Sequence, residues 1–431
     1  MLQHFLKYAY LPFIGIICLW IGLNVQGGKK EFKYVILSDG KGYYSTLPAI
    51  FIYKDLNYSF MDEVEKQHYD SLSHYEFRTA CDIGCTNKYF AGTSLLQLPF
   101  FIGAVIFSSV TDLPVDGYSP PFAIAILFAG VFWMVVGSYY LRKVLLHFDV
   151  TLGLATFIAA VMLFGTNLFY YTVVEPAMSH VYSFALITMF TYFMLNWRKT
   201  FQRRNILLGS IVFGILVFVR PLNGIIIAAL PFLWGHPRQY REQLIDLLRS
   251  QTFLISAVVS IIIPMMQLVL YKISVDRFFV DSYPGETFNF LHPELFNFLF
   301  SYKKGLFVYL PILLVALCGW IFVYRTDKFK AVSGIVFLFV LIWTLSSWWN
   351  WYYGGSFGSR VIIDFLVLFA IPMALVVKNA RKTSVKIFVI SLIVVLTLFC
   401  QIQTYQYRYY LIHWSEMNKE LYWKNFMKLK S

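Results

Sequence analysis

Charged residues are scarce in this chain. They make up 14% of its 431 residues, against about 25% in soluble domains, while 58% are hydrophobic. No Walker A pattern and no Gly-x-Gly-x-x-Gly turn after a strand is present, which argues against work driven by a nucleotide. No internal repeat, low-complexity tract or segment large enough to fold as a separate soluble domain occurs either. The composition therefore indicates a membrane protein.

Cysteine is also rare, with five in the chain. Three lie within apolar runs and are expected to be packing residues: Cys18, Cys318 and Cys400. Cys81 and Cys85 lie in a long polar loop, where an oxidising compartment would permit a disulfide between them. Free thiols are the second interpretation, and a zinc site with His68 and His74 is the third, although the spacings match no strong template.

Apolar runs of about 17–23 residues recur from end to end, each long enough to cross a hydrocarbon core. We predict an all-α polytopic membrane protein with about eleven transmembrane helices, and residues 1–431 as a single integral membrane domain. The first run lacks a small-x-small cleavage site and is expected to be an anchor. The predicted spans are 8–25, 120–141, 151–173, 178–197, 205–219, 222–234, 252–272, 306–324, 331–347, 361–377 and 386–402.

The formal charge of +13 would suggest nucleic acid in a soluble protein, but here the basic residues lie between the spans. Five short basic connections fall on one side of the membrane, which is the positive-inside pattern, so no nucleic-acid partner is expected. This parity places residues 26–119 outside as a first outer loop, with 95–110 as an interfacial or re-entrant segment. It also places the basic tail, 403–431, outside, against the charge rule.

Polar segments are concentrated on the predicted outer side. Four segments there are too polar or too interrupted by glycine and proline to be simple connectors, whereas the inner connections are short and basic: 26–94, 174–180, 275–304 and 348–360. This asymmetry predicts a reaction centre that faces the outer compartment. In a bacterium, that would be the periplasmic or outer side of the inner membrane.

The layout resembles the GT-C superfamily of membrane glycosyltransferases, which includes protein O-mannosyltransferases and the lipid A aminoarabinose transferase. Asp39, in Ser-Asp-Gly-Lys-Gly-Tyr-Tyr, matches the family's first-loop acidic position. Segment 88–92 resembles its lysine-bearing interfacial segment, and 357–360 (Phe-Gly-Ser-Arg) resembles its late arginine loop. The resemblance implies transfer of a sugar from a polyprenyl-phosphate carrier to a glycan, lipid or protein acceptor at the outer face. It leaves a divalent metal cofactor open and assigns no metal ligand.

For such a transfer, Asp39 is the predicted general base, because a carboxylate can take the proton of the acceptor hydroxyl. Asp55 is the alternative base, and a turn-capping role is the structural alternative for Asp39. The leaving lipid phosphate needs fixed positive donors. We predict that these are Lys88, Arg220, Arg277 and Arg360, whereas Lys303 and Lys304 are expected to extend to lipid head groups.

Acceptor or sugar binding is predicted for a second group of outer-face residues: Tyr43, Glu175, His180, Trp349 and Trp351. Glu175 and His180 could equally join two helix ends, and the tryptophans could belong to an aromatic belt at the membrane interface. The competing functions are a secondary transporter or lipid-glycan flippase, and a non-catalytic partner in envelope glycan assembly. A transporter would show repeat symmetry and ionisable residues at mid-membrane, which the sequence does not.

Overall fold

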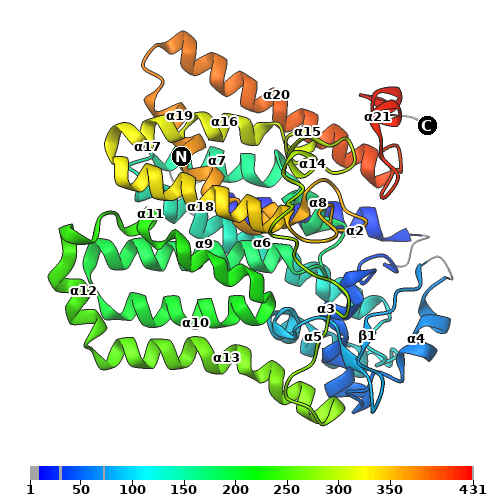
Figure 1. Ribbon diagram of the computed structural model, residues 1–431. Helices are drawn as coiled ribbons and strands as arrows, with labels where there is room; N and C mark the ends of the chain where they lie inside the picture. Colours follow the sequence, from blue (N-terminus) through cyan, green and yellow to red (C-terminus); the bar gives the residue numbers. More distant parts are fainter. Residues whose placement is uncertain (1–8, 29–31, 71–72, 430–431) are drawn as a thin grey trace.

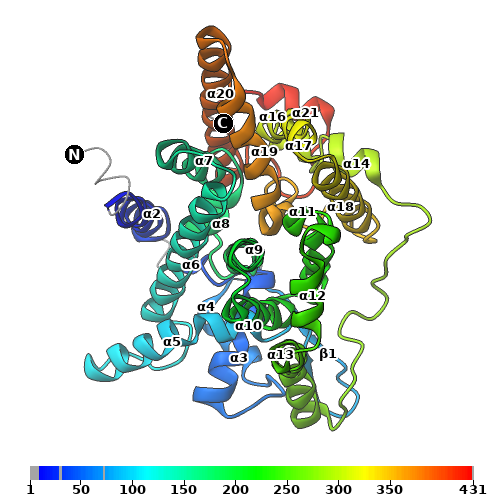
Figure 2. The same cartoon turned by 90° about the vertical axis from the view of Figure 1, so that its left-hand side faces the viewer.

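The computed structural model describes residues 9–28, 32–70 and 73–429. Long helices run side by side along one direction (Figure 1) and are seen nearly end-on in Figure 2. The main helices of this bundle are α2 (Tyr10–Gln26), α6 (Pro120–Leu146), α7 (Leu152–Phe164), α9 (His180–Thr200), α10 (Arg203–Val219), α13 (Gln251–Val275), α18 (Lys328–Ser346), α19 (Val367–Asn379) and α20 (Thr383–Arg408). The all-α prediction is confirmed for the described residues, apart from two strands of two residues each.

The centre and the surface of the bundle differ in what their helices bury. Helix α9 packs against α6 and α10 and buries most of its side chains, and its Thr188 and Thr191 donate to backbone carbonyls one turn earlier. By contrast, α13 and α20 expose most of their apolar side chains. Apolar surface of this extent is stable only against another apolar phase, which lipid provides.

Several predicted spans are runs of shorter helices. The span 306–324 consists of α15 (Leu306–Tyr309), α16 (Ile312–Cys318) and α17 (Trp320–Thr326). At the α16–α17 break, a Cβ on Gly319 would come within 2.0 Å of the Pro372 carbonyl oxygen, so glycine permits the close approach of α19. Three other spans are divided in the same way. Span 151–173 consists of α7 and α8 (Leu168–Val173), span 222–234 of η5 (Pro221–Ala229) and α11 (Leu230–Trp234), and span 361–377 of η7 (Arg360–Phe365) and α19.

Within the described residues, which leave out residue 8 of the first span, the predicted spans thus fall on a helix or on consecutive helices, but their number as membrane crossings stays a prediction. By length and composition, five helices in the described part of the chain could cross a membrane: α5, α6, α13, α18 and α20. Helix α5 (Gly92–Val110) was predicted as interfacial or re-entrant. It is viewed end-on in Figure 1 and lengthwise in Figure 2, so it lies crosswise to the bundle. That direction is the one an interfacial helix would have.

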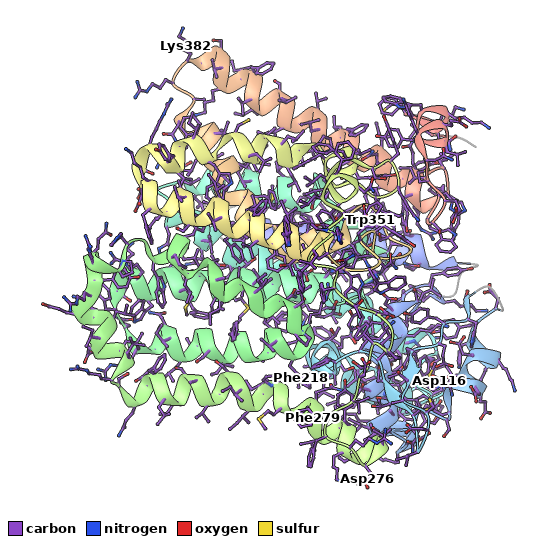
Figure 3. All side chains as sticks on the ribbon, viewed as in Figure 1. Asp116, Phe218, Asp276, Phe279, Trp351 and Lys382 are labelled. Atoms are coloured by element: carbon purple, nitrogen blue, oxygen red, sulfur yellow. A yellow bond between two sulfur atoms is a disulfide. The ribbon has the colours of Figure 1, made fainter. Side chains whose placement is uncertain are left out.

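The two ends of the bundle carry different structures. One end holds the basic connections, η6 (Pro237–Tyr240) and α12 (Arg241–Leu248), with Lys382 at the same end in Figure 3. The other end holds the polar segments (Figure 1), namely α3 (Asp39–Pro48), η3 (Ala49–Tyr53), α4 (Met61–His68), α14 (Leu295–Phe300) and α21 (Lys419–Asn425). The C-terminal segment therefore lies at the same end as the first polar loop.

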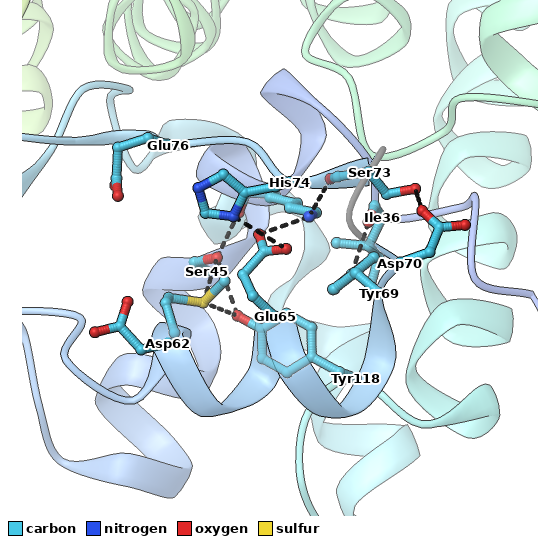
Figure 4. Close-up of polar contacts among 12 residues, drawn as sticks. Ile36, Ser45, Asp62, Glu65, Tyr69, Asp70, Ser73, His74, Glu76 and Tyr118 are labelled. Atoms are coloured by element: carbon cyan, nitrogen blue, oxygen red, sulfur yellow. Dashed lines mark hydrogen bonds and ion pairs between the residues drawn. The ribbon is translucent and has the colours of Figure 1, made fainter.

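A buried lysine holds the first polar loop together. The Lys41 Nζ donates to Glu65 Oε1 at 2.6 Å and to the Ser73 carbonyl oxygen at 2.7 Å, and lies 3.6 Å from the centre of the Tyr69 ring. Figure 4 shows the two hydrogen bonds to Glu65 and Ser73, with His74 beside Glu65. Burial lowers the pKa of Lys41, and Glu65 opposes that shift. This cluster fixes α3 and, with it, the position of Asp39 at its start.

A small hairpin follows in the same loop. Strand β1 (Arg78–Thr79) pairs antiparallel with β2 (Thr86–Asn87), with Arg78 opposite Asn87 and Thr79 opposite Thr86. Cys81 and Cys85, in the connection between the strands, form a disulfide with an S–S distance of 2.11 Å. The first polar loop is therefore a folded layer over the end of the bundle.

Candidate functional site

A cavity of about 1190 Å³ opens at the polar end of the molecule. Its lining comes from the first loop, the α8–α9 connection, the α10–η5 junction, the loop after α13, the 348–360 loop and the end of α20. Seven residues that the sequence analysis selected line it: Asp39, Tyr43, Lys88, Glu175, Arg220, Trp349 and Arg360. Their roles remain predictions, but the fold brings them to one place.

Asp39 and Arg360 form an ion pair in this cavity. Arg360 Nη2 donates to Asp39 Oδ2 at 2.5 Å, and 16% of the aspartate side chain is exposed. Burial raises the pKa of the Asp39 carboxyl, but the Arg360 guanidinium and the hydroxyls of Tyr75 and Tyr89 outweigh burial and hold that pKa below its usual value. Asp39 is therefore a carboxylate at neutral pH.

Two glycines explain the local sequence around Asp39. A Cβ on Gly40 would lie 2.9 Å from the Ala177 Cβ, and one on Gly42 would lie 2.2 Å from the Tyr89 ring. Both glycines therefore permit packing that a larger residue would block. In consequence, the start of α3 lies directly against the α8–α9 connection and against the segment that carries Lys88.

The other two predicted cations in the cavity are also paired. Lys88 forms an ion pair with Glu286. Arg220 Nη1 lies 3.2 Å from Asp364 Oδ2, and Asp364 is fully buried. The same carboxylate accepts from Asn223 at 2.9 Å and lies 2.8 Å from His180 Nδ1. Arg220 is thus held at the cavity wall by a buried network.

Glu175 lines the cavity without an ion-pair partner in the described part of the chain. The Tyr170 hydroxyl donates to its Oε1 at 2.9 Å. Burial raises the pKa of Glu175, although Tyr170, Arg360 and Lys304 oppose the shift. Asp39 and Glu175 therefore face one cavity with pKa values displaced in opposite directions.

Three predicted residues do not line the cavity. Arg277 forms an ion pair with Asp82 at 2.8 Å, and both side chains are about half exposed. Directly before Arg277, Asp276 ends α13 in a left-handed backbone with φ 55°. His180 lies in the buried network behind Arg220, since its ring packs against Asp364 and Tyr171. Trp351 packs edge-on against Tyr352 instead, because its loop turns between Asn350 and Tyr353.

The prediction for Lys304 was wrong. Its side chain is buried, and its Nζ donates to the Ser356 carbonyl oxygen and lies 5.1 Å from the Tyr407 ring centre. Burial lowers the pKa of Lys304 to about 7, and the nearby Arg360 acts in the same direction. Lys303 behaves differently, since its Nζ lies 3.6 Å from the centre of the Tyr352 ring.

Sequence reasoning missed several residues of the cavity and of the buried network behind Arg220. Asp364 lies within the predicted span 361–377, and a carboxylate inside an apolar run is a signal that went unused because the residue was taken as close to the end of that span. Arg408 and Trp414 line the cavity, yet they belong to the tail that the sequence analysis treated as a topological problem. The excess of basic residues in that tail could have pointed to a role in the site.

No metal site stands out. The described residues contain no group of three or more His, Cys, Asp or Glu side chains that could hold a metal ion. Asp39 is paired with Arg360, and Glu286 with Lys88. In the part of the chain that the structure describes, these two carboxylates are therefore held by cations and are not arranged as metal ligands.

Comparison with known proteins gives little. No family model matches the chain, and no curated protein matches it. Among solved structures, it is similar to an archaeal oligosaccharyltransferase, AglB from Archaeoglobus fulgidus, in complex with an inhibitory peptide and a dolichol-phosphate. The identity is 10% and the TM-score 0.43, over 99% of this chain and 60% of the archaeal one. The chain thus spans less than two thirds of that protein, and similarity at this level assigns neither a family nor an activity.

Proposed function

We propose that this protein is a glycosyltransferase that moves a sugar from a polyprenyl-phosphate donor to an acceptor at the outer face of the membrane. The observation that supports it best is the cavity at the polar end of the bundle. There, a carboxylate, Asp39, lies with three cations from distant parts of the chain: Lys88, Arg220 and Arg360. This arrangement suits a reaction that removes a proton from one partner and stabilises negative charge on the other.

The donor fits the mixed character of the cavity wall. One set of lining residues is apolar and would accept the first isoprene units: Phe90, Val219, Pro221, Leu222 and Phe288. Arg220 lines the same cavity as these apolar residues, so a phosphate that follows those units would share the cavity with its guanidinium. Arginine presents a planar fork of donors that matches phosphate oxygens and keeps its charge when partly buried.

The chemistry then follows from Asp39. The acceptor hydroxyl oxygen bonds to the anomeric carbon, its proton passes to Asp39, and the carbon–oxygen bond to the lipid phosphate breaks with its electron pair on the phosphate. Arg360 holds Asp39 in the free protein, which keeps the carboxylate weakly basic. A donor phosphate that shares Arg360 would loosen this pair and raise the pKa of Asp39. Donor binding would thereby strengthen the base.

The test is made in cells that lack the protein. We expect one polyprenyl-phosphate sugar to accumulate and one surface glycan to lose that sugar, and the wild-type chain to restore both. Asp39→Asn should fold normally and fail to restore them, with a loss of about 10²- to 10⁴-fold in transfer by the purified protein.

Asp55→Asn is the matched control. Asp55 accepts from the backbone N–H groups of Asn57 and Ser59, both at 2.8 Å, and so caps a local turn. It does not line the cavity. If no lipid-linked sugar accumulates, or if Asp39→Asn transfers sugar as fast as Asp55→Asn, the proposed function is wrong.

A further inference from the structure

Arg408, the last residue of α20, differs from the other cations of the cavity. Lys88, Arg220 and Arg360 are each paired with a carboxylate. The Nε and Nη2 atoms of Arg408 are buried, and neither has a hydrogen-bond partner among the residues that the structure describes. A buried donor without an acceptor is costly, so a ligand anion at this point would be favourable.

Two tryptophans with exposed faces line the same cavity. Trp414 is 51% exposed and Trp349 is 53% exposed. Each is held in place: a Cβ on Gly355 would lie 2.9 Å from the Trp414 ring, so that ring packs on the Gly355 backbone. The Trp349 indole N–H donates to Glu286 Oε2 at 3.2 Å. Fixed aromatic rings with open faces suit the C–H faces of sugars, because little side-chain freedom is lost on binding.

These groups come from two segments that meet at the cavity. Arg408 and Trp414 belong to the segment after α20, and Trp349 belongs to the 348–360 loop, which contacts that segment through Gly355 and Trp414. Asn350 and Tyr410 line the cavity from the same two segments and add polar groups to its wall. The apolar wall around Val219 and Leu222, where we place the lipid donor, comes from other parts of the chain.

We infer that the acceptor is an acidic carbohydrate chain, which the aromatic rings bind by its sugar faces and Arg408 binds by its carboxylate, phosphate or sulfate. That this glycan is the acceptor rests on the proposed function, whereas its binding at this site does not. An anionic lipid head group would satisfy Arg408 but would leave the faces of Trp349 and Trp414 without a ligand.

The experiment measures binding by the full chain in phosphatidylcholine nanodiscs. Hexagalacturonate is the acidic probe, and maltohexaose is the neutral probe of equal length. We expect hexagalacturonate to bind about tenfold tighter or more, with the preference falling as salt is added. Arg408→Gln should remove the preference without weakening maltohexaose, and Trp414→Ala should weaken both probes.

Lys424→Gln is the matched control, because Lys424 is an exposed cation of the same C-terminal segment and does not line the cavity. It should bind both probes as the wild type does. Trp414→Phe keeps an aromatic ring and should therefore retain part of the affinity. It serves as the second variant if Trp414→Ala proves unstable.

Three results would overturn the inference. The first is hexagalacturonate binding that is absent, or no tighter than that of maltohexaose. The second is an Arg408→Gln variant that keeps the preference. The third is preferential binding of phosphatidylglycerol over phosphatidylcholine by the wild type that Arg408→Gln abolishes, which would make Arg408 a lipid anchor. The binding measurement needs neither a donor nor transfer, so a failure of the proposed chemistry is distinguishable from a failure of this site.

Discussion

Asp39 and Arg360 are separated by 321 positions in the sequence, yet their side chains form a direct ion pair. The pair joins the start of α3 to the start of η7 at the polar end of the bundle. It also makes the protonation of Asp39 depend on Arg360, because the guanidinium lowers the pKa of that carboxyl against the effect of burial.

Arg360→Lys should reduce sugar transfer substantially, although it keeps the positive charge. Lysine replaces a planar fork of donors by a point charge, so it cannot hold Asp39 and a phosphate together. The measurements are the donor concentration dependence and the pH profile of transfer. In Arg360→Gln, the pKa of Asp39 should rise, which moves the acid limb of the profile to higher pH. An unchanged acid limb would show that Asp39 is not the base.

Glu175→Gln should fold as well as the wild type, whereas Glu175→Ala should not. Burial raises the pKa of Glu175, and glutamine keeps an oxygen that can accept from the Tyr170 hydroxyl at the same place. Alanine would leave that hydroxyl without an acceptor, at a cost of about 1–3 kcal/mol. Thermal unfolding in detergent compares the two variants, and equal losses of stability would contradict the assigned hydrogen bond.

Lys304 should make the stability of the protein depend on pH. Burial lowers its folded pKa to about 7, so between about pH 7 and its unfolded value near 10.4 the unfolded chain binds more protons. Stability should therefore rise with pH across that window, by up to about 1.4 kcal/mol per pH unit. Below the folded pKa, this contribution stays constant. Comparison with Lys304→Met, in which the slope should be absent, isolates the effect, and identical slopes would refute it.

Single cysteines introduced at Lys382 and Lys424 should lie on opposite sides of the membrane. Lys382 lies at the end with the basic connections, and Lys424 lies in α21 at the polar end. An impermeant thiol reagent should label the Lys424→Cys variant in intact spheroplasts and label Lys382→Cys only after permeabilisation. The background replaces Cys318, the exposed free cysteine of the described residues. The reverse labelling would invert the predicted topology.

The sequence alone was enough for the class of protein, because an excess of apolar residues is a sum over the chain and does not depend on how the helices pack. It also singled out Arg220 and Arg360, since a charge next to an apolar run is a local feature, whereas Asp39 and Lys88 were selected through a resemblance of short motifs to a known family. The number of membrane crossings and the roles of these residues remain predictions.

Only the tertiary structure decided which charges meet. Arg277 and Arg408 both lie at helix ends on the polar side, yet the first pairs with Asp82 at the surface and the second lines the cavity. Lys303 and Lys304 are neighbours in the sequence, but one lies over Tyr352 and the other is buried beside Ser356. Adjacent side chains leave the backbone in different directions, and the packing around each determines whether it faces solvent, lipid, the cavity or the core.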